Sequence, residues 1–488
     1  MTIIRDHLCA LFLPLTLRDR SADDVRANLV APLTTHPAAG LARLFGCAAV
    51  PAWSEEKKAG KGPERGHDQL TAAARGVLYG DRRDGPPHGR FRGMPPLCLT
   101  PAMLGAWRLA IRLPKEGGDV ALTLAAGRLH LFGTGTALVR LDIRVTEPGL
   151  TLEGLKAVLY QLGRLNLKST RACLLCPAGA DAGAPIGLRA LLDALTVGLT
   201  TGDSPALEPI ADQRLFIYSG IFLDTPLADD RERRLAAYRV SRATSPHEIP
   251  PDEELAEGFL AMGNGNHHAA SQEGGAILRE PREKKPAAKE EESNENYNFL
   301  ADRFVPLYVP LAALAYQEYL TLLRLGDDSR TVVDFDHPDQ QAYRQLKSRN
   351  NDILDLRLNH RFSHVSHMTR VNRVYAAWRS ALALDARLEE LTRDVTEVTA
   401  YLTQRREDDE AHRRATVSHT QTLLGLGYGA LVLLTGVYGM NFPPFNTPEG
   451  AQMDKSMFTL PVLLAEVGIL CAVIWVARAL APKRLDED

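Results

Sequence analysis

Cysteine is scarce in this sequence, and we expect no secretion signal near its first residues. The 488 residues include only 6 cysteines, spread thinly along the chain, which argues against a disulfide scaffold and for a reducing compartment. The apolar stretch from Leu8 to Leu17 is too short to span a membrane and has no small-residue cleavage pattern. We therefore expect the larger, N-terminal part of the chain to be cytoplasmic.

An excess of charge of either sign is also missing. The 57 Lys and Arg residues nearly balance the 60 Asp and Glu residues, so the formal net charge is only -3. Such a balance provides no bulk positive field. We expect no direct binding to nucleic acid.

The motifs of common enzyme classes are absent as well. The segment Gly133-Thr134-Gly135-Thr136 lacks both the Walker lysine and the GxGxxG spacing, so a hairpin turn is the better interpretation. No nucleophile, paired carboxylates or complete metal-ligand set stands at motif spacing. The sequence predicts neither an enzyme nor a covalently bound cofactor.

Residues 1–262 predict a cytoplasmic domain that mixes helices and strands, of the α+β or α/β kind, with mobile insertions. Alternating or β-branched runs predict strands over 120–124, 129–132, 137–145 and 215–223, and helical spacing predicts helices over 152–165, 188–199 and 253–262. A polar, charged segment over 263–296 predicts a disordered linker or loop. We expect His267 and His268, within it, to be solvated.

The next part, 297–416, predicts a helical region that includes a long stalk helix, with helix expected from Pro338 onward. Apolar residues at alternating spacings of four and three predict a heptad seam, which must pack against a helix of the same chain or of a neighbouring subunit. The seam consists of Leu384, Leu388, Leu391, Val395, Val398 and Leu402.

A mixed-charge segment follows the seam, and we refer to its carboxylates as the collar. The collar consists of Glu407, Asp408, Asp409 and Glu410, which lie between two pairs of arginines. One interpretation is i,i+4 pairing on a solvated helix. The other is a carboxylate ring that concentrates divalent cations at the mouth of a pore. The sequence leaves both open.

Three histidines precede the seam at the spacing i, i+4 and i+7. This spacing would place His360, His364 and His367 on one helical face. No carboxylate is in register with them, so the spacing favours a partly buried polar face, and the alternative is a zinc or cobalt site.

Two long apolar runs lie near the C-terminal end. A spanning helix needs about 20 mostly apolar residues, and residues 417–438 and 458–481 predict two such helices, joined by an outer loop over 439–457 and followed by a tail over 482–488. Basic residues flank the pair on its outer ends, so the positive-inside rule predicts that both termini face the cytoplasm. We expect a multi-pass protein of the inner (plasma) membrane.

The segment Tyr438-Gly439-Met440-Asn441-Phe442 closes the first apolar run. Placed between two terminal spans and after a long helical stretch, it resembles the Gly-Met-Asn signature of the CorA family of divalent-cation channels. The resemblance covers residues 339–488 and implies a homo-oligomer, expected to be a pentamer, in the lipid bilayer. It also implies that Gly439, Met440 and Asn441 form the outer mouth and selectivity ring, where Asn441 would hold hydrated Mg2+ through neutral oxygen.

The first run has a face of small and polar residues. That face consists of Ser418, Gln421, Gly425, Gly429, Val432 and Tyr438. Taken alone, it predicts a surface on which helices approach closely. The CorA resemblance implies instead that it lines the pore, with Val432 as a hydrophobic constriction.

Glu466 interrupts the second run, where an ionised carboxylate is costly and usually marks function. One interpretation is a polar contact between helices. The other is proton coupling, as suspected for zinc-transporting relatives of CorA.

These observations predict a CorA-like divalent cation channel gated by its large N-terminal region, with Mg2+ as the transported ion and as a candidate regulatory ion. Because that region is larger than such channels need, the chain also resembles the CorA-like membrane effectors associated with type III CRISPR systems. That likeness implies a role in antiviral defence and a small nucleotide messenger as the gating ligand. The alternatives are a proton-coupled zinc transporter of the same family and a membrane-anchored ligand receptor without transport.

Overall fold

The computed structural model describes residues 2–17, 22–30, 53–55, 69–79, 94–99, 107–112, 119–147, 149–163, 173–177, 207–209, 215–245, 248–281, 299–332 and 340–439, with 464, 467, 468, 471, 472 and 475. The chain divides into two compact units, Met1–Val395 and Thr396–Asp488.

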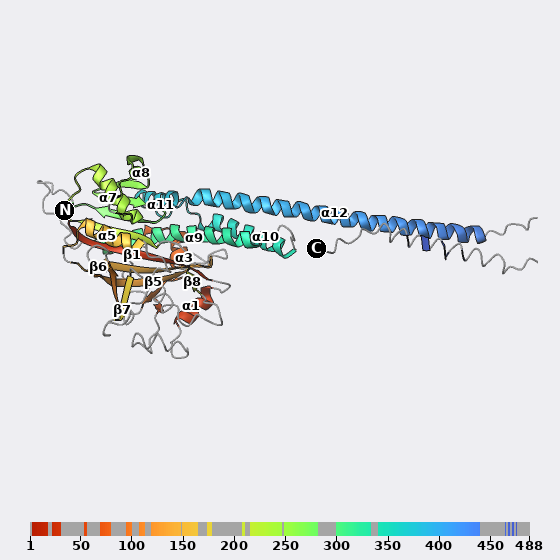
Figure 1. Ribbon diagram of the computed structural model, residues 1–488, viewed down its shortest axis with the longest axis horizontal. Coiled ribbons are helices and arrows are strands. Elements are labelled where there is room, and N and C mark those ends of the chain that lie inside the picture. The colour runs from red at the N-terminus through yellow and green to blue at the C-terminus, as the bar shows by residue number, and fades with distance from the viewer. Residues whose placement is uncertain are drawn as a thin grey trace, which may run out of the picture. The chain divides into compact units, whose positions relative to one another are not determined.

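The first unit is built on a 12-stranded sheet with the order β10-β11-β12-β9-β1-β6-β5-β3-β2, in which β4 also pairs with β5 and β7, and β8 with β1 (Figure 1). Strand β12 runs parallel to β9, and the other described pairs are antiparallel. The strands are β1 (Ile4–Leu17), β2 (Trp53–Glu55), β3 (Leu97–Leu99), β4 (Trp107–Arg112), β5 (Asp119–Leu131), β6 (Thr136–Val145), β7 (Cys173–Pro177), β8 (Leu207–Pro209), β9 (Phe216–Leu223), β10 (Phe259–Gly263), β11 (Asn266–Ala270) and β12 (Gly274–Arg279).

Strand β1 lies inside the sheet, between β6 and β9. Leu11 and Leu13 belong to the hydrophobic core on one face, whereas Leu8 and Phe12 belong to the core on the other. A strand that is buried on both faces needs apolar residues at successive positions. This explains the apolar run from Leu8 to Leu17.

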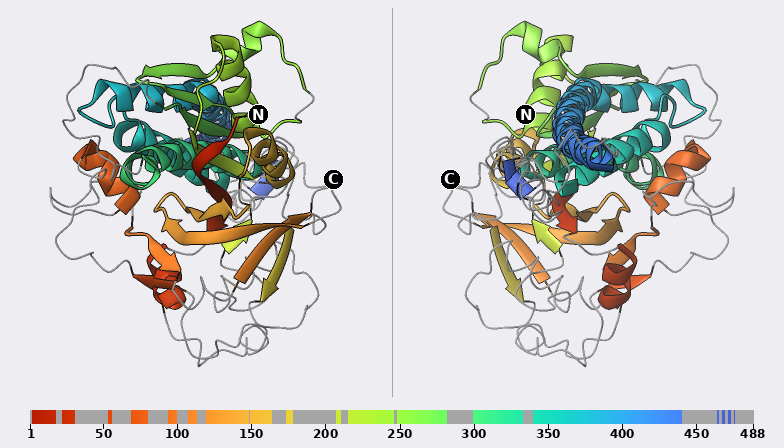
Figure 2. Two further views of the ribbon diagram at one scale, coloured as in Figure 1. Left: turned by 90° about the vertical axis from the view of Figure 1, so that its left-hand side faces the viewer. Right: turned by 90° about the vertical axis from the view of Figure 1, so that its right-hand side faces the viewer.

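Helices cover both faces of the sheet. One core includes α1 (Ala22–Val30), α5 (Leu152–Gly163) and α7 (Asp230–Arg242). The other includes α3 (Ala72–Tyr79), the π-helix η3 (Leu300–Tyr308), α9 (Val309–Val332), α10 (Gln340–Asp355), the π-helix η4 (Leu356–His360), α11 (Thr369–Ala381) and the first turns of α12 (Leu384–Gly439). In the left view of Figure 2, α5 and α9 lie on opposite sides of β1. The expectation of a mixed α and β region followed by a long helix is confirmed.

The hairpin predicted at Gly133-Thr134-Gly135-Thr136 is confirmed. It joins β5 to β6, with the Phe132 N–H donating to the Thr136 carbonyl at 3.0 Å and Gly135 at a φ of 75°. The expected break between strands 120–124 and 129–132 is wrong, because β5 continues through Gly127. A Cβ atom there would lie 2.1 Å from Leu99, so glycine admits the side chain of the neighbouring strand.

The predicted strand over 215–223 and the predicted helix over 152–165 correspond to β9 and α5. The helix expected over 253–262 is too long: α8 (Asp252–Ala256) is short, and β10 begins at Phe259. Gly258 lies between them at a φ of 71°, a conformation that ends the helix. The helix expected over 188–199 lies outside the described residues.

The expectation of a disordered segment over 263–296 is wrong for its first part. This part contains β11 and the whole of β12, which joins the sheet beside β9. Ala276, Ile277 and Leu278 are fully buried. The charged composition of the segment comes mainly from residues beyond 281, which lie outside the described part, and it masked two short strands.

The prediction of continuous helix from Pro338 is also wrong. The chain forms α10, η4 and α11 before α12 begins. The backbone becomes extended at Arg361 after η4, and Ala383 adopts a φ of 50° between α11 and α12. The seam prediction is confirmed for Leu384, Leu388, Leu391 and Val395, which are buried in the core shared with α9 and therefore pack within the same chain.

Candidate functional site

The residues predicted to line a pore lie on one helix. α12 carries all six of them and ends at Gly439. Ser418, Gln421, Gly425 and Gly429 are exposed, and a Cβ atom added at either glycine would meet nothing within 4 Å. The described residues of this chain thus leave the face open, which allows another helix or a passing ion to approach it.

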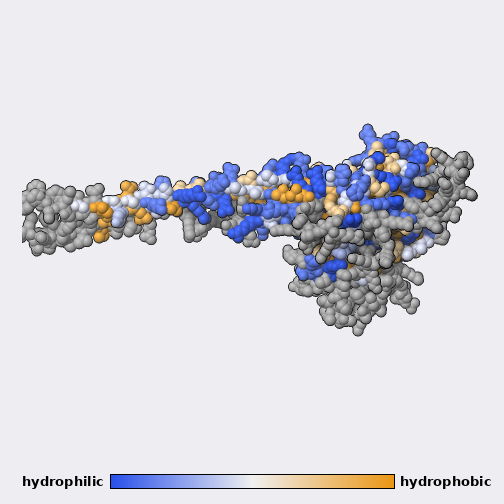
Figure 3. Space-filling view, turned by 180° about the vertical axis from the view of Figure 1, so that it is seen from behind, coloured by the Kyte–Doolittle hydropathy of each residue, from blue (hydrophilic) through white to orange (hydrophobic). Residues whose placement is uncertain are grey.

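The same part of α12 exposes large apolar side chains. Val417 is 55% exposed, Leu424 64%, Leu426 68%, Tyr428 73% and Val432 52%. Figure 3 shows the surface of this helix changing from hydrophilic to hydrophobic along its length. Several large apolar side chains exposed along one helix are typical of surfaces that contact a partner or lipid.

Among the helices that the structure describes, none is long and apolar enough to cross a membrane. The side chain of Tyr438 and the whole of Met440, Asn441 and Glu466 lie outside the described part, so the geometry of the predicted selectivity ring and of the intramembrane carboxylate stays a prediction. Leu464, Val467 and Trp475, from the predicted second span, are exposed at 65%, 53% and 71%.

The four collar residues are exposed on α12. Glu410 forms i,i+4 ion pairs, at 3.2 Å with Arg406 and at 3.3 Å with Arg414. The pairing interpretation therefore holds for Glu410. Exposed pairs of this kind contribute little to stability, and the ring of carboxylates stays a prediction.

The three histidines predicted on one helical face do not share a helix. Helix η4 ends at His360, whereas His364 and His367 lie in the following non-helical segment, where both are exposed. The prediction of a common face is wrong because the chain leaves the helix at Arg361. Among the described residues, no group of three or more His, Cys, Asp or Glu side chains is arranged to hold a metal ion.

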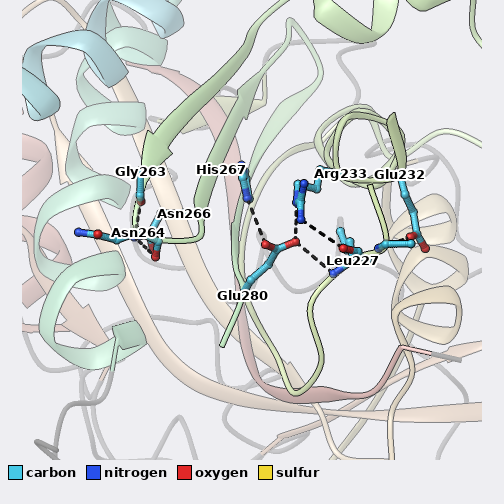
Figure 4. Close-up of polar contacts among 9 residues, drawn as sticks. Leu227, Glu232, Arg233, Gly263, Asn264, Asn266, His267 and Glu280 are labelled. Atoms are coloured by element: carbon cyan, nitrogen blue, oxygen red, sulfur yellow. Dashed lines mark hydrogen bonds and ion pairs between the residues drawn. The ribbon is translucent and has the colours of Figure 1, made fainter. Parts of the chain in front are cut away.

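His267, expected to be solvated, is instead part of a polar cluster around Glu280 (Figure 4). The Glu280 carboxylate accepts hydrogen bonds from the Arg233 guanidinium at 2.9 Å and from the Leu227 N–H at 3.1 Å. The Nε2 atom of His267 lies 3.6 Å from Glu280 Oε2. Burial lowers the pKa of His267, against the nearby carboxylate, so the imidazole is neutral at neutral pH. The cluster joins α7 to β11 and to the residue that follows β12.

His268, on the opposite face of β11, is fully buried. Its ring contacts Tyr218 and Trp378 edge-on, with centroids 5.9 Å and 5.5 Å away. The expectation of a solvated His268 is wrong, because β11 alternates its side chains between the two faces of the sheet. His268 therefore belongs to the aromatic core beneath α11.

A pocket of about 680 Å³ opens between α7, α8 and the joint of α11 with α12. Its charged lining residues are Arg242, Glu248, Glu254, Glu257 and Glu273. Burial, together with the hydrogen bond that its hydroxyl donates to Glu254, raises the pKa of Tyr238 in this wall to about 12. Four carboxylates facing one guanidinium make this pocket a poor match for an anionic nucleotide and a better match for a cationic or neutral polar molecule.

A second polar network lies where α12 begins, and sequence reasoning missed it. Glu318 on α9 is almost fully buried, and the Arg379 Nη1 atom donates to its two carboxylate oxygens at 3.1 Å and 2.9 Å. Arg379 Nη2 also donates to Asp385, in the first turn of α12, at 2.6 Å. The one sign of this network in the sequence is Glu318 itself, an acidic residue inside the apolar run of α9.

No family profile matches the chain. A search of curated proteins likewise finds no match. Among solved structures, the chain is similar to the CorA magnesium transporter of Methanocaldococcus jannaschii, with 13% sequence identity and a TM-score of 0.21 over 56% of this chain and 95% of that chain. A similarity at this level does not assign a function, so any assignment has to rest on the residues of this chain.

Proposed function

We propose that this chain is one subunit of a CorA-like, homo-oligomeric membrane channel for divalent cations, with Mg2+ as the transported ion. The observation that carries the proposal is the run of exposed apolar side chains on α12 from Val417 to Val432, which leads directly into Gly439-Met440-Asn441 in the sequence. Lipid and other copies of the chain would cover this surface.

The proposed span extends beyond the side chains that the structure describes. It includes residues 433–435 and 437–438, which are mostly apolar, so that a charge-free stretch reaches from Val417 to Tyr438. About 20 such residues are enough to cross the hydrocarbon core. In the proposed assembly of five subunits, the face with Gly425 and Gly429 lines the pore, and the collar lies at its cytoplasmic end.

Asn441 has the chemistry that a hydrated magnesium ion needs. Mg2+ dehydrates reluctantly and prefers oxygen ligands in octahedral geometry. A ring of neutral carboxamides can bind its water shell without removing it. We expect Gly439 and Met440 to position that ring.

The test is Mg2+ flux into liposomes that contain the purified full chain and a fluorescent magnesium indicator. Asn441→Ala should reduce the flux at least tenfold and leave the oligomer intact, because it removes only the ion-binding amide. Asn446→Ala, a second asparagine in the same loop, is the matched control and should conduct normally.

The same liposomes distinguish this proposal from other assignments. Zn2+ uptake that depends on a pH gradient and is lost in Glu466→Gln would favour a proton-coupled transporter. Wild-type liposomes that conduct no divalent ion would indicate a receptor without transport. Second-messenger control, as in the CRISPR-associated effectors, is a separate part of the proposal, and a nucleotide that changes the flux would support it.

A further inference from the structure

Arg379 lies between two carboxylates on two different helices. On its inner side it contacts Glu318 of α9, whose side chain is 2% exposed. On its outer side it contacts Asp385 of α12, whose side chain is 59% exposed and is also held by Arg361 at 2.9 Å. The Tyr375 hydroxyl also donates to Glu318, at 3.3 Å, so Arg379 is its charged partner beside one neutral donor. Removing the charged partner of a buried carboxylate is costly.

The chain changes direction beside this residue. α11 ends at Ala381 and α12 begins at Leu384, with Ala383 in the left-handed region at a φ of 50°. Residues other than glycine adopt this conformation at a cost of roughly 1 kcal/mol or more. The connection between α11 and α12 is packed on its apolar side by three fully buried residues, Trp378, Leu382 and Leu384. Arg379 supplies its polar contact.

Glu318, on the inner side of Arg379, is the group whose charge can change with pH. Burial raises the pKa of Glu318 to about 6, although the Arg379 guanidinium and the Tyr375 hydroxyl act in the opposite direction. Among the described residues, Arg379 and Tyr375 of α11 and Asp385 of α12 are the titratable groups that act on Glu318. Burial also raises the pKa of Tyr375, which therefore stays neutral. Glu318 is ionised at neutral pH and takes up a proton under mildly acidic conditions.

We propose that Arg379 holds the first turn of α12 against α9 and α11, and we call its contacts with Glu318 and Asp385 the clasp. Proton uptake by Glu318 loosens the clasp. This loosening regulates the channel. The regulatory part rests on the proposed function. When Glu318 is neutral, the inner contact loses its ion pair, and Arg379 is held mainly by the exposed Asp385. Because α12 is a single helix through Gly439, a change in its first turn can reach the proposed pore segment.

Glu318→Gln tests the clasp directly, because glutamine has nearly the same shape and cannot ionise. At a constant pH of 7, we expect amide hydrogen exchange over residues 382–388 to be at least threefold faster in Glu318→Gln than in the wild-type chain. The matched control is Arg393→Gln, which breaks an exposed ion pair with Glu389 elsewhere on α12 and should not change exchange at the joint. Equal exchange in all three chains would overturn the clasp, whatever the chain transports.

The regulatory part is tested by Mg2+ flux in liposomes between pH 5.5 and pH 7.5. We expect the wild-type flux to change at least threefold with a midpoint near pH 6, and Glu318→Gln at pH 7 to match the wild type at pH 5.5. A Glu318→Gln profile that follows the wild-type profile would overturn the regulation and leave the channel assignment intact. Absence of any divalent flux in the wild type would overturn the proposed function, and the exchange measurement would still decide on the clasp.

Asp385→Asn provides a second variant in case Glu318→Gln fails to fold, since Asp385 is exposed. It weakens the ion pairs of Asp385 with Arg379 and Arg361 and leaves the contact of Arg379 with Glu318 in place, so hydrogen exchange at residues 382–388 should also become faster. The pH dependence of the flux should remain, because Glu318 can still titrate. Unchanged exchange in Asp385→Asn would contradict the two-sided clasp.

Discussion

His268 is the residue whose burial has the clearest energetic consequence. Its side chain is fully buried, and neither ring nitrogen has a hydrogen-bond partner among the described residues. Burial lowers its pKa to about 3, so the imidazole is neutral in the folded chain. A buried donor without an acceptor costs roughly 1–3 kcal/mol, which means that this side chain contributes to the fold through its ring contacts and not through its polar atoms.

We predict that His268→Phe keeps the ring contacts with Tyr218 and Trp378 and raises the free energy of unfolding at pH 7.5 by about 1 kcal/mol. It should also reduce acid sensitivity. The folded-state pKa lies below the unfolded value, so below pH 6.5 the unfolded chain binds a proton that the folded chain does not, and the folded state loses stability as the pH falls toward 3. Between pH 7.5 and pH 5 this loss amounts to about 2 kcal/mol.

Denaturant unfolding of the purified chain at these two pH values measures both effects. The exposed His364→Gln is the control and should leave the free energy of unfolding at pH 7.5 unchanged. Some acid sensitivity should remain in His268→Phe, because burial also lowers the pKa of His7 to about 4. An unchanged pH dependence in His268→Phe would show that His268 is protonated without penalty.

The packing of helix η3 on the sheet depends on one glycine of β9, Gly220. A Cβ atom at Gly220, in β9, would lie 2.7 Å from the Phe304 ring and 2.9 Å from Leu300, both in η3. Glycine at this position lets the π-helix approach the strand. Pro306, inside η3, cannot donate a backbone hydrogen bond, so the packing of this helix on the sheet matters for its stability.

We predict that Gly220→Ala lowers the free energy of unfolding by about 1–3 kcal/mol, because the added methyl group forces two helical side chains outward. The measurement is the denaturation midpoint followed by circular dichroism. Gly76→Ala in α3 is the matched control, since a Cβ atom there meets nothing within 4 Å and alanine favours a helix. A Gly220→Ala midpoint equal to that of the wild type would mean that η3 can shift at no cost.

Strands and turns are predicted best from the sequence where a short segment alone determines the backbone conformation. The run at 215–223 and the glycine turn at 133–136 were interpreted correctly, because β-branched residues and positive φ act within a few positions. β11 and β12 were missed because average composition hides short strands. Their burial depends on β9, a partner outside their own segment, and no local signal reveals such a partner.

The candidate site was less predictable than the fold. The face with Gly425 and Gly429 follows from helical spacing alone, and α12 confirms that these residues are helical. The three histidines failed because their spacing assumes an unbroken helix through Arg361. The Glu318 contact with Arg379 joins two helices, so neither segment predicts it alone.

A substitution at Gly429 can test the proposed pore of the whole assembly without disturbing the fold of the single chain. Nothing in the described chain lies within 4 Å of a Cβ atom at this position. We predict that Gly429→Leu leaves the helix content and the unfolding midpoint unchanged but reduces Mg2+ flux at least tenfold, because the side chain would enter the proposed pore.

Ala430→Leu is the control, because the next residue points about 100° away around the helix. It adds similar bulk to a face that we do not assign to the pore, and it should conduct. Equal flux in the two leucine variants would contradict the assignment of the Gly429 face.

The place of β1 between β6 and β9 has a consequence for how the chain is made. The Ser219 hydroxyl of β9 contacts the Cys9 thiol of β1 across 210 positions of sequence. The ribosome therefore releases β1 long before the strand that closes one of its edges. During that interval an apolar strand with an open edge can pair with other nascent chains. We therefore expect slow translation before residue 216, or a holding chaperone, to matter more for the yield of this protein than the strength of any single contact in the finished fold.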